Sequence, residues 1–200
     1  MASIDKSLST YRLKLSEALD DVVNMVALTY DGFMKHKKAT LQQAEALGRT
    51  IHQFEKTFDE AVIKEGDKEG VRLLLALAGH VERIGDCLEA VIRTVHTKVV
   101  EGTLFSDKAV AELSSIYTAV RDMARDVKDV VLTGNPVLVE HTVAASEKTS
   151  QAARDFATHH QERLISGVCQ PKHSSLYLDM VDNLRMVSGH LREMVENIRD

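Results

Sequence analysis

The 200-residue sequence contains no tryptophan, only two prolines and two cysteines, and aromatic residues make up 4% of it. Alternating runs typical of strands are few, whereas Ala, Leu, Glu, Lys and Val are abundant. The composition therefore predicts an all-α protein. Cys87 and Cys169 are too few for a disulfide framework and too far apart for a zinc-knuckle spacing.

Basic clusters and long apolar runs are also scarce. The net charge is −5, and the only short basic cluster is residues 35–38, KHKK. Because neutralising phosphates requires clustered Lys and Arg, the charge balance argues against nucleic acid as a partner. The first residues lack the apolar region of a signal peptide, and the most apolar run, residues 71–78, is far shorter than the roughly 20 residues that cross a bilayer. We therefore expect a cytoplasmic protein without membrane insertion.

Breaks in the apolar pattern divide the chain into six predicted helices. Thr40 and Gln43 form a capping-box pattern, and Asp67 is a predicted N-cap. Residues 134–136, Gly-Asn-Pro, supply a C-terminal glycine, an N-cap and a proline at the first helical position. The predicted helices begin near residues 9, 40, 67, 106, 136 and 174.

The apolar stripes of the third and sixth predicted helices align when residue 81 is laid on residue 184. The matched residues are Leu77, Val81, Ile84, Leu88, Val91 and Val95 with Met180, Leu184, Val187, Leu191, Met194 and Ile198. We interpret this as two tandem three-helix bundles, residues 1–102 and 103–200. A single six-helix domain with unrelated halves is the alternative.

A row of acidic residues lies along one side of the third predicted helix. Glu82, Asp86 and Glu89 are spaced by four and three residues, which places them on one stripe of an α-helix. At 100° per residue, this stripe lies roughly 140–200° from the apolar one. The row can hold a hard cation, or it can be a solvated face that pairs with Arg83 and Arg93.

Two segments carry recognisable motifs. Residues 73–86 read LLLALAGHVERIGD, in which VERIGD follows an apolar stretch, and residues 104–113 read LFSDKAVAEL. The first resembles the LERIGD motif of the PhoU family of phosphate-uptake regulators, and the second is similar to that family's FSDKA…EL opening of the second repeat. The resemblance implies a pair of three-helix bundles that restrain phosphate import and help to silence phosphate signalling. The implied partner is a phosphate transporter component or a phosphate-sensing kinase. It also implies E/D-x-x-x-D motifs that bind clusters of iron or another divalent metal.

The family's acidic motif is complete only in the third predicted helix. Glu82 and Asp86 carry it there, whereas Gly48 and His52 stand where the second helix should have acids. In the second half, the corresponding positions hold Arg185, Gly189 and Arg192 in the sixth helix and Glu147 and Gln151 in the fifth. The predicted metal ligands are Glu82, Asp86, Glu89 and His52, with Glu55 and Asp59 as further contributors. His52 as an ordinary exposed histidine is the alternative.

The sequence is compatible with three functions. The first is a PhoU-like regulator that acts by protein contact, with a homodimer left open. The second is a histidine phosphorelay carrier, which labelling by an acyl phosphate or a kinase would reveal, although none of the nine histidines is marked for that role. The third is a metal-dependent enzyme, which the lack of a Gly-rich phosphate loop or an activated nucleophile disfavours. His80 lies close to the apolar stripe and is predicted to pack there.

Overall fold

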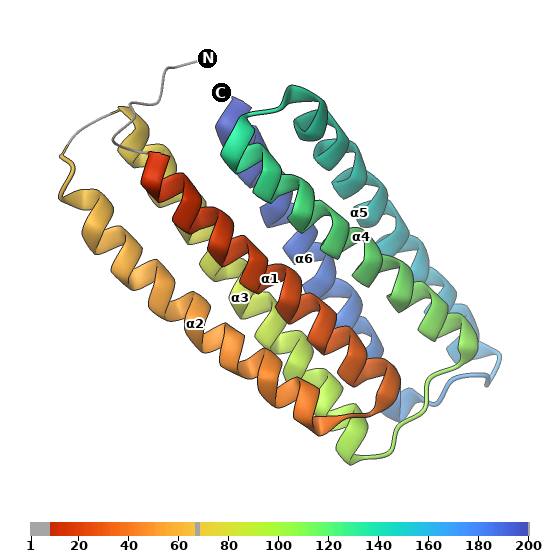
Figure 1. Cartoon of the computed structure of the whole chain (residues 1–200). Coiled ribbons are helices and arrows are strands. Elements are labelled where there is room, and N and C mark those ends of the chain that lie inside the picture. Colours follow the sequence, from red (N-terminus) through yellow and green to blue (C-terminus); the bar gives the residue numbers. More distant parts are fainter. Residues whose placement is uncertain (1–8, 67–68, 200) are drawn as a thin grey trace.

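Six long helices form this molecule in the computed structural model, which describes residues 9–66 and 69–199. Their axes lie roughly along one line, with successive helices running up and down, and this gives the molecule an elongated shape (Figure 1). No strand occurs in the described part of the chain, so the predicted all-α fold is confirmed there. The elements are α1 (Ser9–Lys35), α2 (Lys38–Ile63), α3 (Glu69–Val100), α4 (Asp107–Thr133), α5 (Pro136–Ile165), the short 3-10 helix η2 (Pro171–His173) and α6 (Ser174–Arg199).

The break between α4 and α5 has the predicted structure. Gly134 follows α4 in the left-handed conformation, with φ 64°, which glycine adopts without steric cost. The Asn135 side chain then accepts a hydrogen bond from the Val137 backbone N–H at 3.0 Å, and Pro136 opens α5. At the other end of α4, the Ser106 side chain accepts from a backbone N–H in the first turn.

The predicted capping box at the start of α2 is wrong. The helix begins at Lys38, and its N-cap, Lys37, makes no side-chain cap hydrogen bond. The Thr40 hydroxyl instead donates to the Lys37 carbonyl at 2.8 Å. His36, with φ 54°, turns the chain sharply enough for α2 to start two residues before Thr40. The predicted N-cap Asp67 lies outside the described residues.

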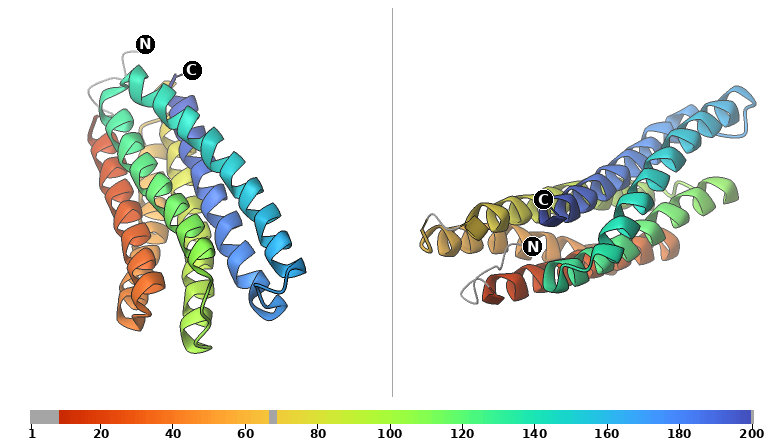
Figure 2. Two further views of the ribbon diagram at one scale, coloured as in Figure 1. Left: turned by 90° about the vertical axis from the view of Figure 1, so that its right-hand side faces the viewer. Right: turned by 90° about the horizontal axis from the view of Figure 1, so that it is seen from above.

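The helices pack in two groups of three. Within α1, α2 and α3 each helix contacts the other two, and the same holds for α4, α5 and α6. The groups meet along α3 with α6 and along α1 with α4, which lie side by side in both views of Figure 2. One continuous cluster of buried apolar residues runs through all six helices. The division at residues 102 and 103 therefore stays a prediction.

The apolar stripe predicted for α3 faces this core. Its members are buried, as are the matched residues of α6 from Met180 to Met194, whereas Ile198 is only partly buried. Burial of such stripes is the main source of helix stability in a bundle. The opposite side of α3 is consequently left to the acidic row. None of the described helices is long and apolar enough to pass through a bilayer.

Candidate metal centre on the α2–α3 face

Two glycines allow α2 and α3 to approach closely beside the acidic row. A Cβ atom at Gly85 on α3 would lie 3.0 Å from the Cγ2 of the buried Ile51 on α2. A Cβ atom at Gly48 on α2 would lie 2.5 Å from Oε1 of Glu89 on α3. The Glu89 carboxylate therefore occupies the space that a side chain at position 48 would take.

Three of the four predicted ligands meet at this place. The Nε2 atom of His52 lies 3.2 Å from Oε1 of Glu89 and 3.8 Å from Oδ1 of Asp86. One donor atom from each residue lies within 4.8 Å of the other two, and the three side chains are partly or largely exposed. We call His52, Asp86 and Glu89 the α2–α3 triad. His52 and Glu89 are 37 positions apart in the chain, and the packing of α2 on α3 thus brings them within hydrogen-bonding distance.

Glu82, the fourth predicted ligand, lies one helical turn away and belongs to a different group. Its charge acts on Asp59 of α2, whose pKa is raised, first by burial and further by Glu82, while a hydrogen bond with Glu55 opposes the rise. Among the described residues, Oδ1 of Asp59 is buried without a hydrogen-bond partner. We call Glu55, Asp59 and Glu82 the acidic cluster. It extends the negative charge of the triad along the α2–α3 face.

One contact agrees with the alternative prediction that the acidic row is a solvated face paired with arginines. Arg93 approaches the second oxygen of Glu89, Oε2, at 3.8 Å, and the Arg93 side chain is 69% exposed. An exposed pair of this kind contributes little to stability. It also leaves Oε1 of Glu89 directed at His52, so the pairing with Arg93 and the triad coexist.

The donor set of the triad fits a divalent cation. Two carboxylates suit hard ions, and the addition of an imidazole suits manganese or iron. Ligands bound at 2.1–2.5 Å in octahedral geometry lie about 3.0–3.5 Å apart, close to the 3.2 Å between His52 and Glu89. The oxygen of Asp86 is slightly farther, at 3.8 Å, and this residue is exposed enough to adjust.

The second half has positive charge at the corresponding place. Arg192, which matches Glu89, donates to Glu196 at 2.9 Å and lies 4.0 Å from Glu147 of α5. Arg185, which matches Glu82, pairs with Asp182 of its own helix. A guanidinium thus lies beside the only acidic residue at the matched positions, Glu147, and these positions offer no second carboxylate.

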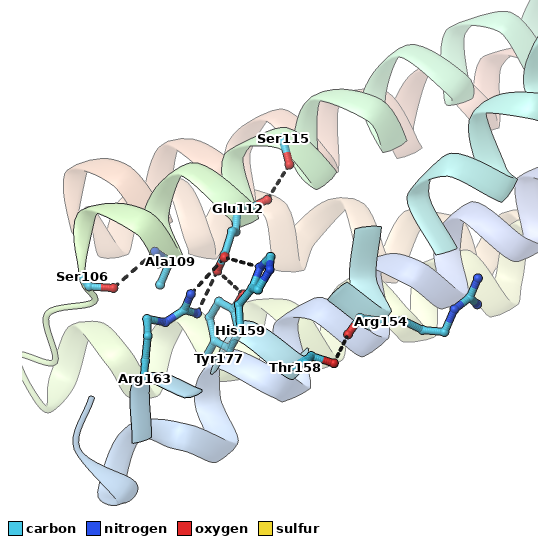
Figure 3. Close-up of polar contacts among 9 residues, drawn as sticks. All are labelled: Ser106, Ala109, Glu112, Ser115, Arg154, Thr158, His159, Arg163 and Tyr177. Carbon is cyan, nitrogen blue, oxygen red and sulfur yellow. Dashed lines mark hydrogen bonds and ion pairs between the residues drawn. The ribbon is translucent and has the colours of Figure 1, made fainter. Parts of the chain in front are cut away.

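A buried charge cluster at one end of the second half was missed in the sequence. Figure 3 shows the Glu112 carboxylate of α4 facing Arg163 of α5 and Tyr177 of α6. The two terminal guanidinium nitrogens of Arg163 donate to the two carboxylate oxygens of Glu112 at 2.9 and 2.8 Å, and the Tyr177 hydroxyl donates to Oε2 at 2.6 Å. His159 lies 3.6 Å from Oε1. We call Glu112, Arg163 and Tyr177 the buried charge cluster, and it connects three helices.

A signal for this cluster is present in α5. The buried positions of that helix are mostly polar and recur at helical spacing: Val139, Thr142, Ser146, Thr149, Ala153, His160 and Arg163. A helix that turns polar side chains toward a core must find partners for them on its neighbours. The identity of the partners is not encoded locally, because Glu112 is 51 residues away from Arg163.

An open pocket of about 450 Å³ adjoins this cluster and includes His160 and Tyr177 among its lining residues. The His160 ring stacks on the Tyr177 ring, and its Nε2 atom lies 2.6 Å from the Ser174 hydroxyl. Burial lowers the pKa of His160, and the charge of Arg163 lowers it further against the opposing effect of Glu112. This pocket is one place where an enzymatic alternative could be sought.

Gly48→Ala tests how Glu89 is positioned. The added methyl group would displace Oε1 of Glu89 from its place beside His52, since the two atoms would otherwise be 2.5 Å apart. We expect Mn²⁺ affinity to fall about tenfold, while replacing a helix-interior glycine should stabilise the helix by up to about 1 kcal/mol. Isothermal titration and thermal unfolding measure the two effects. Unchanged Mn²⁺ affinity would show that Glu89 does not depend on the space at position 48.

Comparison with known structures identifies the fold. The crystal structure of PhoU from Pseudomonas aeruginosa is similar to this chain with a TM-score of 0.86, over 98% of this chain and 97% of that one, at 17% sequence identity. This chain therefore has a PhoU-like fold, and the resemblance seen in the two sequence segments is confirmed at the level of fold. No family model matches the sequence, and no curated protein matches it significantly.

Proposed function

We propose that this chain, with its PhoU-like fold, is a regulator of phosphate transport or phosphate signalling that acts in the cytoplasm by protein–protein contact. The contact surface is the α2–α3 face, and its partner is a phosphate transporter component or a phosphate-sensing kinase. Regulation rather than catalysis is the role that long, exposed helical faces support. The observation that carries the proposal is the concentration of acidic side chains on that one face.

The charge pattern supports this choice of face. The α2–α3 triad and the acidic cluster place five carboxylates along adjoining turns of two helices: Glu55, Asp59, Glu82, Asp86 and Glu89. Arg93 is the one basic side chain that approaches the triad within 4 Å in the described part of the chain, and it is largely exposed. Such a surface attracts a basic partner and mainly accelerates its association.

A divalent ion fits this interface. His52, Asp86 and Glu89 would hold it, and a bound ion supplies further coordination positions that oxygen ligands of a partner can fill. The chain's own contribution is to orient the three donors: Gly48 leaves room for Glu89, and the close packing of Gly85 on Ile51 fixes the distance between the two helices. Arg93 lies 3.8 Å from Oε2 of Glu89 and leaves Oε1 free to face His52.

Charge reversal tests the face directly. Replacing Glu82, Asp86 and Glu89 together by lysine should derange phosphate accumulation as gene deletion does, because a basic partner is then repelled. The fold should remain, since surface substitutions usually change the free energy of unfolding by at most about 0.5 kcal/mol each. Phosphate uptake in deleted cells carrying wild-type or variant genes measures the effect, under scarce and abundant phosphate.

The matched control reverses three acids on α5, with the same change in net charge. Glu140, Glu147 and Asp155 are exposed there, and their replacement by lysine should leave uptake as in the wild type. Circular dichroism and thermal unfolding confirm that both variants fold. Normal phosphate accumulation in the deleted strain would contradict the function, and equal effects of the two reversals would contradict the choice of the α2–α3 face.

A further inference from the structure

A second group of metal-binding residue types lies between the two halves of the molecule. His80 of α3 faces His190 and Glu193 of α6. The two histidine side chains are mostly buried, with 14% and 20% of their surface exposed, whereas Glu193 is 54% exposed. A small ion can therefore reach the group from solvent. We call these three residues the α3–α6 triad.

The spacing of the three donor atoms is nearly uniform. The Nδ1 atoms of His80 and His190 are 3.4 Å apart, and Oε2 of Glu193 lies 3.4 Å from the first and 3.3 Å from the second. Zinc–ligand bonds of 2.0–2.1 Å at tetrahedral angles separate neighbouring donors by about 3.3–3.4 Å. Octahedral coordination with bonds of that length brings them to about 2.9 Å. The triangle matches one face of a tetrahedral site.

Ring stacking and hydrogen bonding among the three side chains explain this geometry less well than a bound ion does. The imidazole rings are not stacked, because their centroids are 5.5 Å apart and their planes differ by 43°. A single carboxylate oxygen faces both Nδ1 atoms at distances longer than a charge-assisted hydrogen bond of about 2.7–2.9 Å. An ion at the centre of the triangle would satisfy all three donors together.

A neighbouring amide on α6 can orient the His80 ring. Nδ2 of the Asn197 side-chain amide lies 3.3 Å from Nε2 of His80. With Nδ1 on a metal, Nε2 carries the proton and donates, so the amide would turn over to present its oxygen and hold the ring in place.

We propose that His80, His190 and Glu193 form a zinc-type site that joins α3 to α6, with water as the fourth ligand. It lies apart from the α2–α3 triad and differs in donor chemistry. Two imidazoles and one carboxylate select a borderline ion with tetrahedral preference, whereas two carboxylates and one imidazole select a harder one. Because α3 and α6 connect the two halves, a bound ion would hold the halves together.

The experiment uses the full chain in which His52, Asp86 and Glu89 are replaced by alanine, so that the other triad cannot contribute. Titration with Zn²⁺ should give one site, and His190→Gln in this background should weaken it at least 100-fold. The matched control is His96→Gln, an exposed histidine of α3, which should leave the affinity unchanged. Zn²⁺ should also raise the thermal unfolding temperature of the control but not that of the His190 variant.

Co²⁺ supplies a test of geometry, and Glu193→Gln supplies a variant with little risk to folding because Glu193 is half exposed. We expect the strong visible absorption of tetrahedral Co²⁺, lost in both His190→Gln and Glu193→Gln. Equal Zn²⁺ affinity in the His190 and His96 variants would overturn the proposal. Weak, octahedral Co²⁺ absorption in the parent protein would overturn it as well.

Discussion

Arg163→Met is expected to lower the free energy of unfolding by about 3–5 kcal/mol, which is the usual cost of removing one partner of a buried ion pair. Glu112 is buried and receives both guanidinium hydrogen bonds from Arg163, so the substitution leaves a carboxylate in the core with only the Tyr177 hydroxyl as a donor. Denaturation by urea measures the loss as a lower midpoint at unchanged slope.

The control for this prediction removes the whole buried charge cluster. Glu112→Leu, Arg163→Met and Tyr177→Phe together leave no unpaired polar atom of the three, and apolar replacements of buried ion pairs are often neutral or stabilising. The triple variant should therefore be more stable than Arg163→Met alone. A single variant as stable as the wild type would mean that Glu112 finds another partner, and His159 is the nearest.

Acid should weaken the same cluster. Burial raises the pKa of Glu112, but hydrogen bonds from Arg163 and Tyr177 and the charge of Arg163 outweigh burial and leave it below its usual value. Its stabilising contribution is therefore complete above the unfolded-state pKa of about 4.3 and is lost as the pH falls through the lower folded-state pKa. Below about pH 4.3, the wild type should therefore lose stability faster than the triple apolar variant.

Replacing His52, Asp86 and Glu89 by alanine is expected to weaken Mn²⁺ binding at least 100-fold. All three donors of the α2–α3 triad are then lost, whereas even outer-shell changes at metal sites cost about 10–100-fold. The fold should be kept, because none of these side chains belongs to the apolar core. Electron paramagnetic resonance of free Mn²⁺ gives the affinity.

Two controls separate this site from its surroundings. Alanine at Glu147, Gln151 and Arg192 removes the matched positions of the second half and should leave Mn²⁺ binding unchanged. Glu82→Ala alone should have a smaller effect than Glu89→Ala, since Glu82 lies with the acidic cluster rather than in the triad. Mn²⁺ affinity equal in the wild type and the triad variant would contradict the assignment.

Local sequence patterns were sufficient for most of the fold. The helix starts at residues 9, 136 and 174 and the break at Gly134 are as expected, because apolar periodicity and capping residues act within a few positions. The capping box at Thr40 failed because a threonine hydroxyl can donate to a carbonyl as readily as it accepts from an N–H. Such competition is decided by the path of the preceding turn.

The candidate sites were predictable only as far as single helices define them. The common stripe of Asp86 and Glu89 follows from helix geometry. The contact of Glu89 with His52, and the electrostatic effect of Glu82 on Asp59, depend on how α2 is shifted along α3. His80 was predicted as a packing residue, and the residue that it approaches, His190, is 110 positions away in the chain. Contacts of this range follow from the packing of the whole molecule.

Arg192 has a consequence for how a partner is oriented. Each group of three helices offers an outer pair, α2 with α3 and α5 with α6, so a partner that recognises helix surfaces alone has two comparable places to dock. At the second place the Arg192 guanidinium pairs with Glu196 and lies beside Glu147, so it offsets part of the negative charge that would attract a cationic partner there. One arginine thereby makes the two places unequal and favours a single polarity of such a partner along the long axis of the molecule.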